Sequence, residues 1–142
     1  MVAANTAGTV VIAPRWEAGR EYTCLGSFAI PEALETGDTF TITGLLPANV
    51  NRVVGVDYFG TEFDTNASPT ATITIGDGTD PDGYMAALTA GNANGQLTLM
   101  GYGALHNTTS AAGANVVVTV GGTVATAASS GTGYVRIRYF CG

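Results

Sequence analysis

Lysine is missing from this 142-residue sequence, and its five basic residues are all arginines. Without lysine, the chain cannot contain a P-loop lysine, a Schiff base or an anchor for pyridoxal phosphate. The net charge of -6 argues against nucleic-acid binding, because that affinity comes from neutralising phosphates with basic side chains. We therefore expect no nucleic-acid partner and no lysine-dependent cofactor.

Charge of either sign is scarce, since only 11% of the residues are charged, against about 25% in a typical soluble domain. Two interpretations fit this shortage. The surface is covered by Thr, Ser, Asn, Gly and Ala, or much of it is buried against copies of itself or another protein, because the centres of interfaces are depleted in charge. The shortage favours the second interpretation.

Long apolar runs are also absent, so we expect no membrane-spanning segment. The first residues, MVAANTAGTVV, lack the basic start and apolar centre of a signal peptide, and the expected place of synthesis is the cytoplasm of the producing cell. Cys24 and Cys141 have no histidine near them in the sequence and do not make a zinc site. They are buried thiols, or a disulfide if their Cα atoms lie within about 7 Å.

Helix-forming composition is confined to Tyr84–Ala90, with one further helical turn predicted at Pro31–Gly37. Alternation of apolar and polar residues instead predicts strands over most of the chain. The predicted strands are Glu21–Ile30, Thr39–Gly44, Val53–Phe59, Thr70–Gly76, Gln96–Met100, Asn115–Val120, Thr123–Ala127 and Tyr134–Cys141. Short strands separated by turns are typical of a β-sandwich or barrel.

Two of these segments carry further predictions. Asn115–Val120 and Thr123–Ala127 flank Gly121-Gly122, which predicts a hairpin with a two-residue turn. In the last strand, alternation places Arg136 and Arg138 on the face opposite its apolar residues. Leu45–Asn51 and Gly101–Ala114 are predicted loops. We expect an N-terminal arm over residues 1–20 and a single β-sandwich domain over residues 21–142.

Six of the eleven carboxylates lie within Arg52–Tyr84: Asp57, Glu62, Asp64, Asp77, Asp80 and Asp82. Asp77, Asp80 and Asp82 belong to a glycine-rich loop, Asp77–Gly83, whose composition is that of a calcium loop. The spacing departs from the EF-hand pattern, and Asp and Gly are also ordinary turn residues. We therefore favour an acidic turn without a metal ion, and these three residues are only weak candidates for ligands.

The sequence contains only weak indications of a catalytic site. Asp57 and Asp64 are a conceivable glycosidase pair, because that chemistry needs two carboxylates around one bond. His106 is the only histidine, in a Gly- and Thr-rich loop, and no serine lies in a GxSxG setting. We expect a protein that is not an enzyme and has no cofactor.

The chain resembles the small virion proteins of tailed bacteriophages, and most closely their head decoration, or cement, proteins. The resemblance rests on a polar N-terminal arm, the segment VVGVDYFGTEFDTNASPTATITIGDGTDPDGYM, a Gly/Ala/Thr-rich stretch and the terminal GYVRIRYF. It implies an all-β, jelly-roll-like antiparallel β-sandwich with an extended N-terminal arm. It also implies a homotrimer on the outer capsid surface that bridges neighbouring copies of the major capsid protein and stabilises the head.

Trp16 either packs on the edge of its own domain or anchors the Arg15–Glu21 segment on a neighbouring subunit. Arg15, Trp16 and Arg20 are the predicted interface residues, because Trp and Arg are favoured where proteins meet. Two other functions stay open. One is a tail-fibre or spike module that binds host glycans, although no internal repeats or heptads are present. The other is a calcium-dependent carbohydrate-binding or hydrolase domain.

Overall fold

The computed structural model describes residues 20–62, 64–88, 98–99, 113–127 and 130–141. Within these ranges the chain forms eight strands and no helix. The strands are β1 (Glu21–Ile30), β2 (Thr39–Leu46), β3 (Val50–Gly60), β4 (Thr72–Gly76), β5 (Met85–Leu88), β6 (Thr98–Leu99), β7 (Ala114–Gly121) and β8 (Gly131–Cys141). No helix that could cross a membrane occurs in this described part of the chain.

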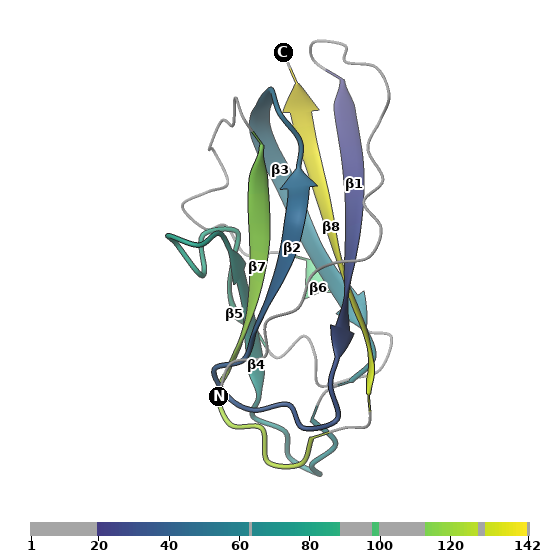
Figure 1. The fold of residues 1–142 in the computed structure, drawn as a ribbon, viewed down its shortest axis with the longest axis vertical. Helices are drawn as coiled ribbons and strands as arrows, with labels where there is room; N and C mark the ends of the chain where they lie inside the picture. Colours follow the sequence, from purple (N-terminus) through teal and green to yellow (C-terminus); the bar gives the residue numbers. More distant parts are fainter. Residues whose placement is uncertain (1–19, 63, 89–97, 100–112, 128–129, 142) are drawn as a thin grey trace.

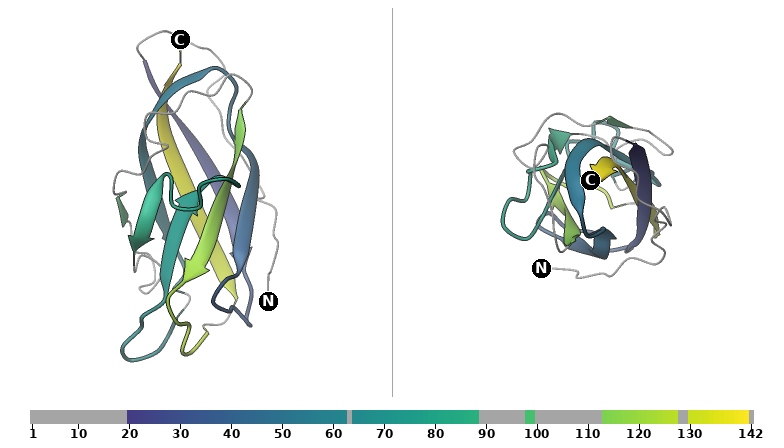
Figure 2. Two further views of the ribbon diagram at one scale, coloured as in Figure 1. Left: turned by 90° about the vertical axis from the view of Figure 1, so that its left-hand side faces the viewer. Right: turned by 90° about the horizontal axis from the view of Figure 1, so that it is seen from above.

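The strands form two four-stranded antiparallel sheets, ordered β1-β8-β3-β6 and β2-β7-β4-β5. Successive strands from β1 to β4 alternate between the sheets, and the last strand, β8, lies between β1 and β3 (Figure 1). Figure 2 shows the second sheet in front of the first, and the end-on view shows the strands surrounding one core. Eight strands in this order are a jelly roll, which confirms the predicted fold class.

The core lies between the two sheets and follows directly from the alternation in the sequence. In β1, residues of one parity are buried, among them Tyr22, Cys24 and Phe28. Phe28 stacks on Phe40 of β2 with ring centroids 4.7 Å apart, so this pair joins the sheets. Burying a side chain of this kind contributes about 1.5–3 kcal/mol.

Cys24 is a free, buried thiol. Its backbone partner on β8 is Ile137, four residues before Cys141, a separation of about 13 Å along a strand. That exceeds the reach of a disulfide. Burial raises the pKa of the Cys24 thiol to about 12, so it packs as a small hydrophobic group.

The predicted hairpin after β7 is wrong. Gly122 does turn the chain, with a φ of 65°, but both edges of β7 are already paired, one with β2 and the other with β4. Residues 123–127 therefore pass to the loop after β3, where Ala127 forms an isolated bridge with Asp64. Tertiary pairing decides against the local hairpin signal.

The described residues contain no helix at the segment of helix-forming composition or at the predicted helical turn. Within Tyr84–Ala90, Met85–Leu88 form β5 and pair with β4, because a short segment gains more from an existing strand edge than from nucleating a helix. Pro31–Gly37 forms turns instead of a helical turn. The predicted Leu45–Asn51 loop is also too long, since β2 continues to Leu46 and β3 begins at Val50.

Candidate interaction surface

The outer face of the β1-β8-β3-β6 sheet gathers arginine and aromatic side chains. Strand register pairs Arg136 of β8 with Leu25 of β1 and Asp57 of β3, and Arg138 with Thr23 and Gly55. Because β8 buries Val135, Ile137 and Tyr139 on its inner face, its arginines lie on the outer face, as the sequence predicted. The last strand thus carries two cations across the middle of the sheet.

Asp57 is fully buried beneath these arginines. Nε and Nη2 of Arg136 lie 2.7 and 2.6 Å from Oδ2 of Asp57. The other carboxylate oxygen, Oδ1, has no hydrogen-bond partner within the described residues. A buried carboxylate needs an oppositely charged partner to offset its desolvation, so the ion pair gives Asp57 a structural role as the anchor of Arg136. Asp64, the other member of the conceivable glycosidase pair, lies in the loop after β3.

Arg138 lies one row further along β8. Its Nε is 3.9 Å from Oδ2 of Asp57, and its Nη1 is 3.9 Å from Oε1 of Glu21. The guanidinium crosses directly over Gly55, where an added Cβ would lie 2.1 Å from Nη2. Glycine at position 55 therefore gives Arg138 its place on the sheet.

Aromatic rings border the arginines. Phe59 and Tyr134 are cross-strand partners and stack with ring centroids 5.1 Å apart. At the other end, Phe140 pairs with the exposed Arg52, which makes no ion pair within the described residues. We call this set the arginine face: Arg52, Phe59, Tyr134, Arg136, Arg138 and Phe140. Arg and aromatic residues are enriched where proteins bind one another.

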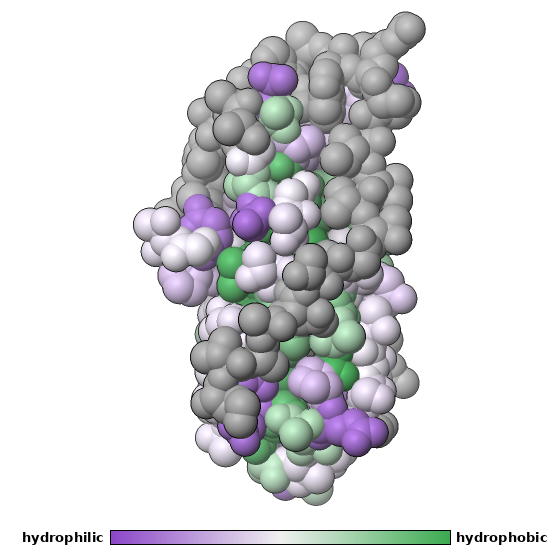
Figure 3. Space-filling view, in the orientation of Figure 1, coloured by the Kyte–Doolittle hydropathy of each residue, from purple (hydrophilic) through white to green (hydrophobic). Residues whose placement is uncertain are grey.

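The opposite sheet has a different character, because none of its four strands contains a charged residue. One row across its outer face consists of Thr39, Thr119 and Thr74, on β2, β7 and β4. All four arginines in the described part of the chain are in β3 and β8 or directly before β1. On the side seen in Figure 3, hydrophilic residues form separate groups among apolar and neutral ones.

The Asp77–Gly83 loop joins β4 to β5 and projects from the left side of the molecule in Figures 1 and 3. Oδ1 of Asp77 accepts hydrogen bonds from the backbone N–H groups of Thr79 and Asp80, both at 2.7 Å. This acidic loop is therefore held by its own turn. No group of three or more candidate ligand side chains is placed to hold a metal ion within the described residues.

The carboxylates of this loop act on one another. A hydrogen bond with the Asp82 side chain, some desolvation and the negative charges of Asp82 and Asp77 raise the pKa of Asp80. No ion pair connects Asp77, Asp80 or Asp82 to an arginine in the part of the chain that the structure describes. The loop is a concentration of uncompensated negative charge.

Asp64 has a structural role in the loop after β3. Its Oδ1 accepts hydrogen bonds from the backbone N–H groups of Asn66 and Thr126, both at 3.2 Å. Burial raises the pKa of this carboxyl, but backbone hydrogen bonds outweigh burial and the net shift is downward. Asp64 thus joins two connections that lie far apart in the sequence.

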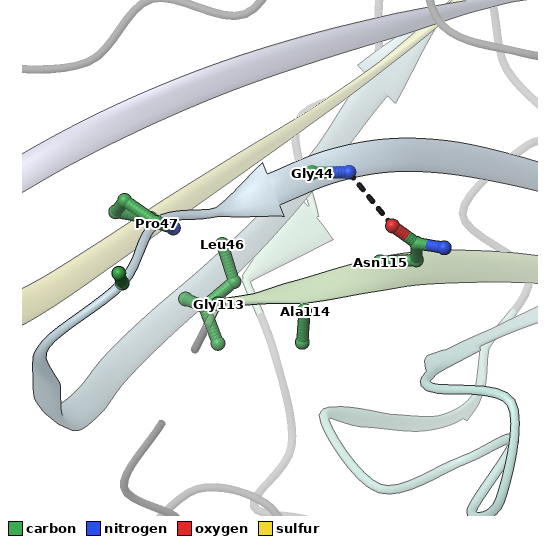
Figure 4. A pocket seen from close by; sticks show the side chains of 7 residues that line it. Gly44, Leu46, Pro47, Gly113, Ala114 and Asn115 are labelled. Carbon is green, nitrogen blue, oxygen red and sulfur yellow. Dashed lines mark hydrogen bonds between the residues drawn. The ribbon is translucent and has the colours of Figure 1, made fainter. Parts of the chain in front are cut away.

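A hollow of about 430 Å³ lies where β2 ends and β7 begins (Figure 4). It is lined by Gly44, Leu46, Pro47, Ala48, Gly113, Ala114 and Asn115. Oδ1 of Asn115 accepts a hydrogen bond from the N–H of Gly44 at 2.8 Å, across the register shift between Ile42 and Leu46. The hollow is open and holds no titratable side chain among these residues, so it offers no catalytic group.

Of the predicted interface residues, Arg15 and Trp16 lie outside the described residues, as does His106. Arg20 is exposed, and its guanidinium carbon lies 5.8 Å from the centre of the Tyr22 ring.

Sequence analysis did not identify Phe59, Tyr134 or Phe140 as surface residues. In β8, Tyr134 and Phe140 have the same parity as Arg136, and in β3 Phe59 has the same parity as Asp57. This alternation was the signal that could have predicted their outward position.

No protein-family model and no curated protein matches the sequence. Solved structures do match. One is a chain of the Cyanophage Pam1 capsid asymmetric unit, with 26% sequence identity and a TM-score of 0.75 over 95% of this chain and 94% of that chain. A chain in the capsid of Ralstonia phage GP4 is 21% identical, with a TM-score of 0.70 over 99% of both chains, and shows the shared fold. The similarity to the Cyanophage Pam1 capsid chain supports a structural role in a bacteriophage virion.

Proposed function

We propose that this protein is a capsid decoration protein without enzymatic activity. It binds the outer surface of a phage head, bridges neighbouring copies of the major capsid protein and stabilises the shell. The similarity to the Cyanophage Pam1 capsid chain carries the proposal, because it extends over 95% of this chain and 94% of that one. The match therefore involves a capsid component of nearly the same length and not a module within a larger protein.

The distribution of charge and aromatic residues also supports binding to proteins. The arginine face offers Arg and aromatic groups, and the opposite sheet is without charged residues in its strands. Surfaces of this composition suit contacts with other subunits. The acidic total of -6 suits a protein on the outside of a shell, away from the packaged DNA.

The proposed capsid contact is the N-terminal arm, with Arg15, Trp16 and Arg20 as its anchors. An arm that reaches a neighbouring subunit adds a second contact to the one made by the folded domain. Linked contacts raise the overall affinity strongly, because the second binding event is intramolecular. We propose that the protein is a homotrimer, so each trimer offers three N-terminal arms to the capsid.

The test is the addition of purified protein to phage heads that lack it, followed by imaging of the heads and counting of bound copies. We expect many copies on the head exterior at positions between major capsid subunits, and heads that resist heat or osmotic shock better than undecorated ones. A few copies confined to the tail would instead identify a fibre or spike module. Binding to isolated glycans without binding to heads would also overturn the proposal.

A further inference from the structure

The arginine face and the acidic loop form a complementary pair that a single molecule cannot bring together. The face belongs to the β1-β8-β3-β6 sheet, and the loop joins two strands of the other sheet. In Figure 1 the loop projects at the left side of the molecule, whereas β8, which carries Arg136 and Arg138, lies between β3 and β1. Each copy thus presents opposite charges on different sides.

Both surfaces are accessible to a partner. The side chains of Arg136 and Arg138 are 38% and 37% exposed, and Arg52 is exposed. The three guanidinium groups outnumber the carboxylates beside them, Asp57 and Glu21, and Asp57 is buried.

The acidic loop presents negative charge that no arginine compensates within the described part of the chain. Asp77, Asp80 and Asp82 have no arginine partner within the described residues, and Asp82 is exposed. A hydrogen bond with the Asp82 side chain, and also burial and repulsion by Asp82 and Asp77, raise the pKa of Asp80. A guanidinium group placed beside them would remove that repulsion.

We propose that two copies of this chain associate head to tail, with the arginine face of one copy binding the Asp77–Gly83 loop of the next. The contact is heterologous, because each copy uses two different surfaces, and contacts of this kind close into a ring when the rotation between copies allows it. The ring would be the homotrimer of the proposed function, and the inference extends that function by naming the surfaces. The Phe59–Tyr134 stack supplies an apolar border to the charged contact.

Charge reversal on each surface tests this association in solution. Arg52→Glu and Asp82→Arg change exposed residues, so both full-length variants should fold, which circular dichroism checks. Analytical ultracentrifugation should show that each variant self-associates about tenfold more weakly than the unchanged protein. Raising the salt concentration should weaken the unchanged protein in the same direction.

Recovery of self-association in a double variant is the decisive measurement. The double variant Arg52→Glu/Asp82→Arg carries a reversed face and a reversed loop, so its copies are again complementary and association should return. In an equimolar mixture of the two single variants, complementary contacts form only between unlike chains, so a ring of three keeps one mismatched contact and association should return only in part. Glu32→Arg reverses an exposed carboxylate in the turn after β1, away from both surfaces, and should leave association unchanged.

Several results would overturn the inference. They are a monomer at all concentrations, single variants that associate normally, and a double variant that stays as weak as the single ones. Head binding by the same variants is measured separately. Protein that forms rings in solution and fails to bind heads contradicts the decoration function alone, whereas variants that associate normally and lose head binding assign the arginine face to the shell.

Discussion

Arg136 places both Nε and Nη2 against one oxygen of Asp57, at 2.7 and 2.6 Å. The two residues are cross-strand partners on β8 and β3, so the ion pair spans the joint between the last strand and the middle of the chain. Asp57 is buried, and Arg136 is partly exposed. The arginine therefore compensates a charge that water cannot reach.

Arg136→Gln should lower the free energy of unfolding by about 3 kcal/mol, because it leaves a buried carboxylate without its main partner. The retained Arg138, 3.9 Å away, keeps the loss at the lower end of the usual range. Adding Asp57→Asn should recover most of the stability in urea unfolding. Arg52→Gln is the matched control and should change stability by less than about 0.5 kcal/mol; equal effects of the two arginine variants would contradict the assignment.

Asp64 should give the protein a stability component that depends on pH. Its pKa is lowered in the folded state, so the ionised form stabilises the fold above the unfolded pKa of about 3.9. That contribution is lost as the pH falls through the folded pKa. Asp64→Asn keeps an acceptor for Asn66 and Thr126 without the charge, and should be less stable than the unchanged protein at pH 7 but nearly equal to it near pH 2.

Asp64→Ala removes the acceptor altogether and should cost about 1–3 kcal/mol at pH 7, because two backbone N–H groups lose their partner. Urea unfolding at several pH values separates the two variants. A constant difference between Asp64→Asn and the unchanged protein across this pH range would show that the carboxylate does not titrate with folding.

Two glycines next to the acidic loop form a matched pair. A Cβ at Gly76 would lie 1.9 Å from the carbonyl oxygen of Asp80, whereas a Cβ at Gly78 meets nothing within 4 Å. Gly76→Ala should therefore displace the loop and destabilise the protein by about 1–3 kcal/mol. Gly78→Ala should be neutral or raise stability by up to about 1 kcal/mol. Thermal unfolding measures both, and a tolerant Gly76 would mean that the loop is not packed against the end of β4.

Deleting residues 1–19 tests the arm. The strands and core described above begin at Glu21, so the truncated protein should keep its β-rich circular dichroism spectrum and lose affinity for phage heads. Trp16→Ala in the full-length chain should weaken head binding in the same direction, since truncating a buried Trp anchor at an interface costs about 2 kcal/mol or more. Full occupancy of heads by the truncated protein would rule out the arm as an anchor.

Strands whose two faces differ were predictable from the sequence alone. β1 has the predicted bounds, and the inward residues of β8 are those that the alternation indicated. The Val53–Phe59 segment, which is apolar on both parities except for Asp57, lies inside its sheet, between β8 and β6. Local periodicity is enough where one face meets the core and the other does not.

Pairing between distant strands was not predictable in this way. The hairpin signal around Gly121 is local, but the edges of β7 are occupied by β2 and β4. The contact between Arg136 and Asp57 depends on the register of residues 79 positions apart. The aromatic border of the arginine face depends on that same register, and a single sequence does not contain it.

The central place of β8 has a consequence for biosynthesis. Its ten paired residues with β1 and its ladder with β3 mean that the first and third strands meet through the last one. While the C-terminal segment is still inside the ribosome, the nascent chain has no partner for the inner edges of either strand. The sheet that carries the arginine face is therefore completed only after β8 has left the ribosome, and contacts so distant in sequence fold slowly. Until then, the unpaired edges of β1 and β3 can pair with other copies of the chain, and correct folding depends on closure of the sheet outpacing aggregation.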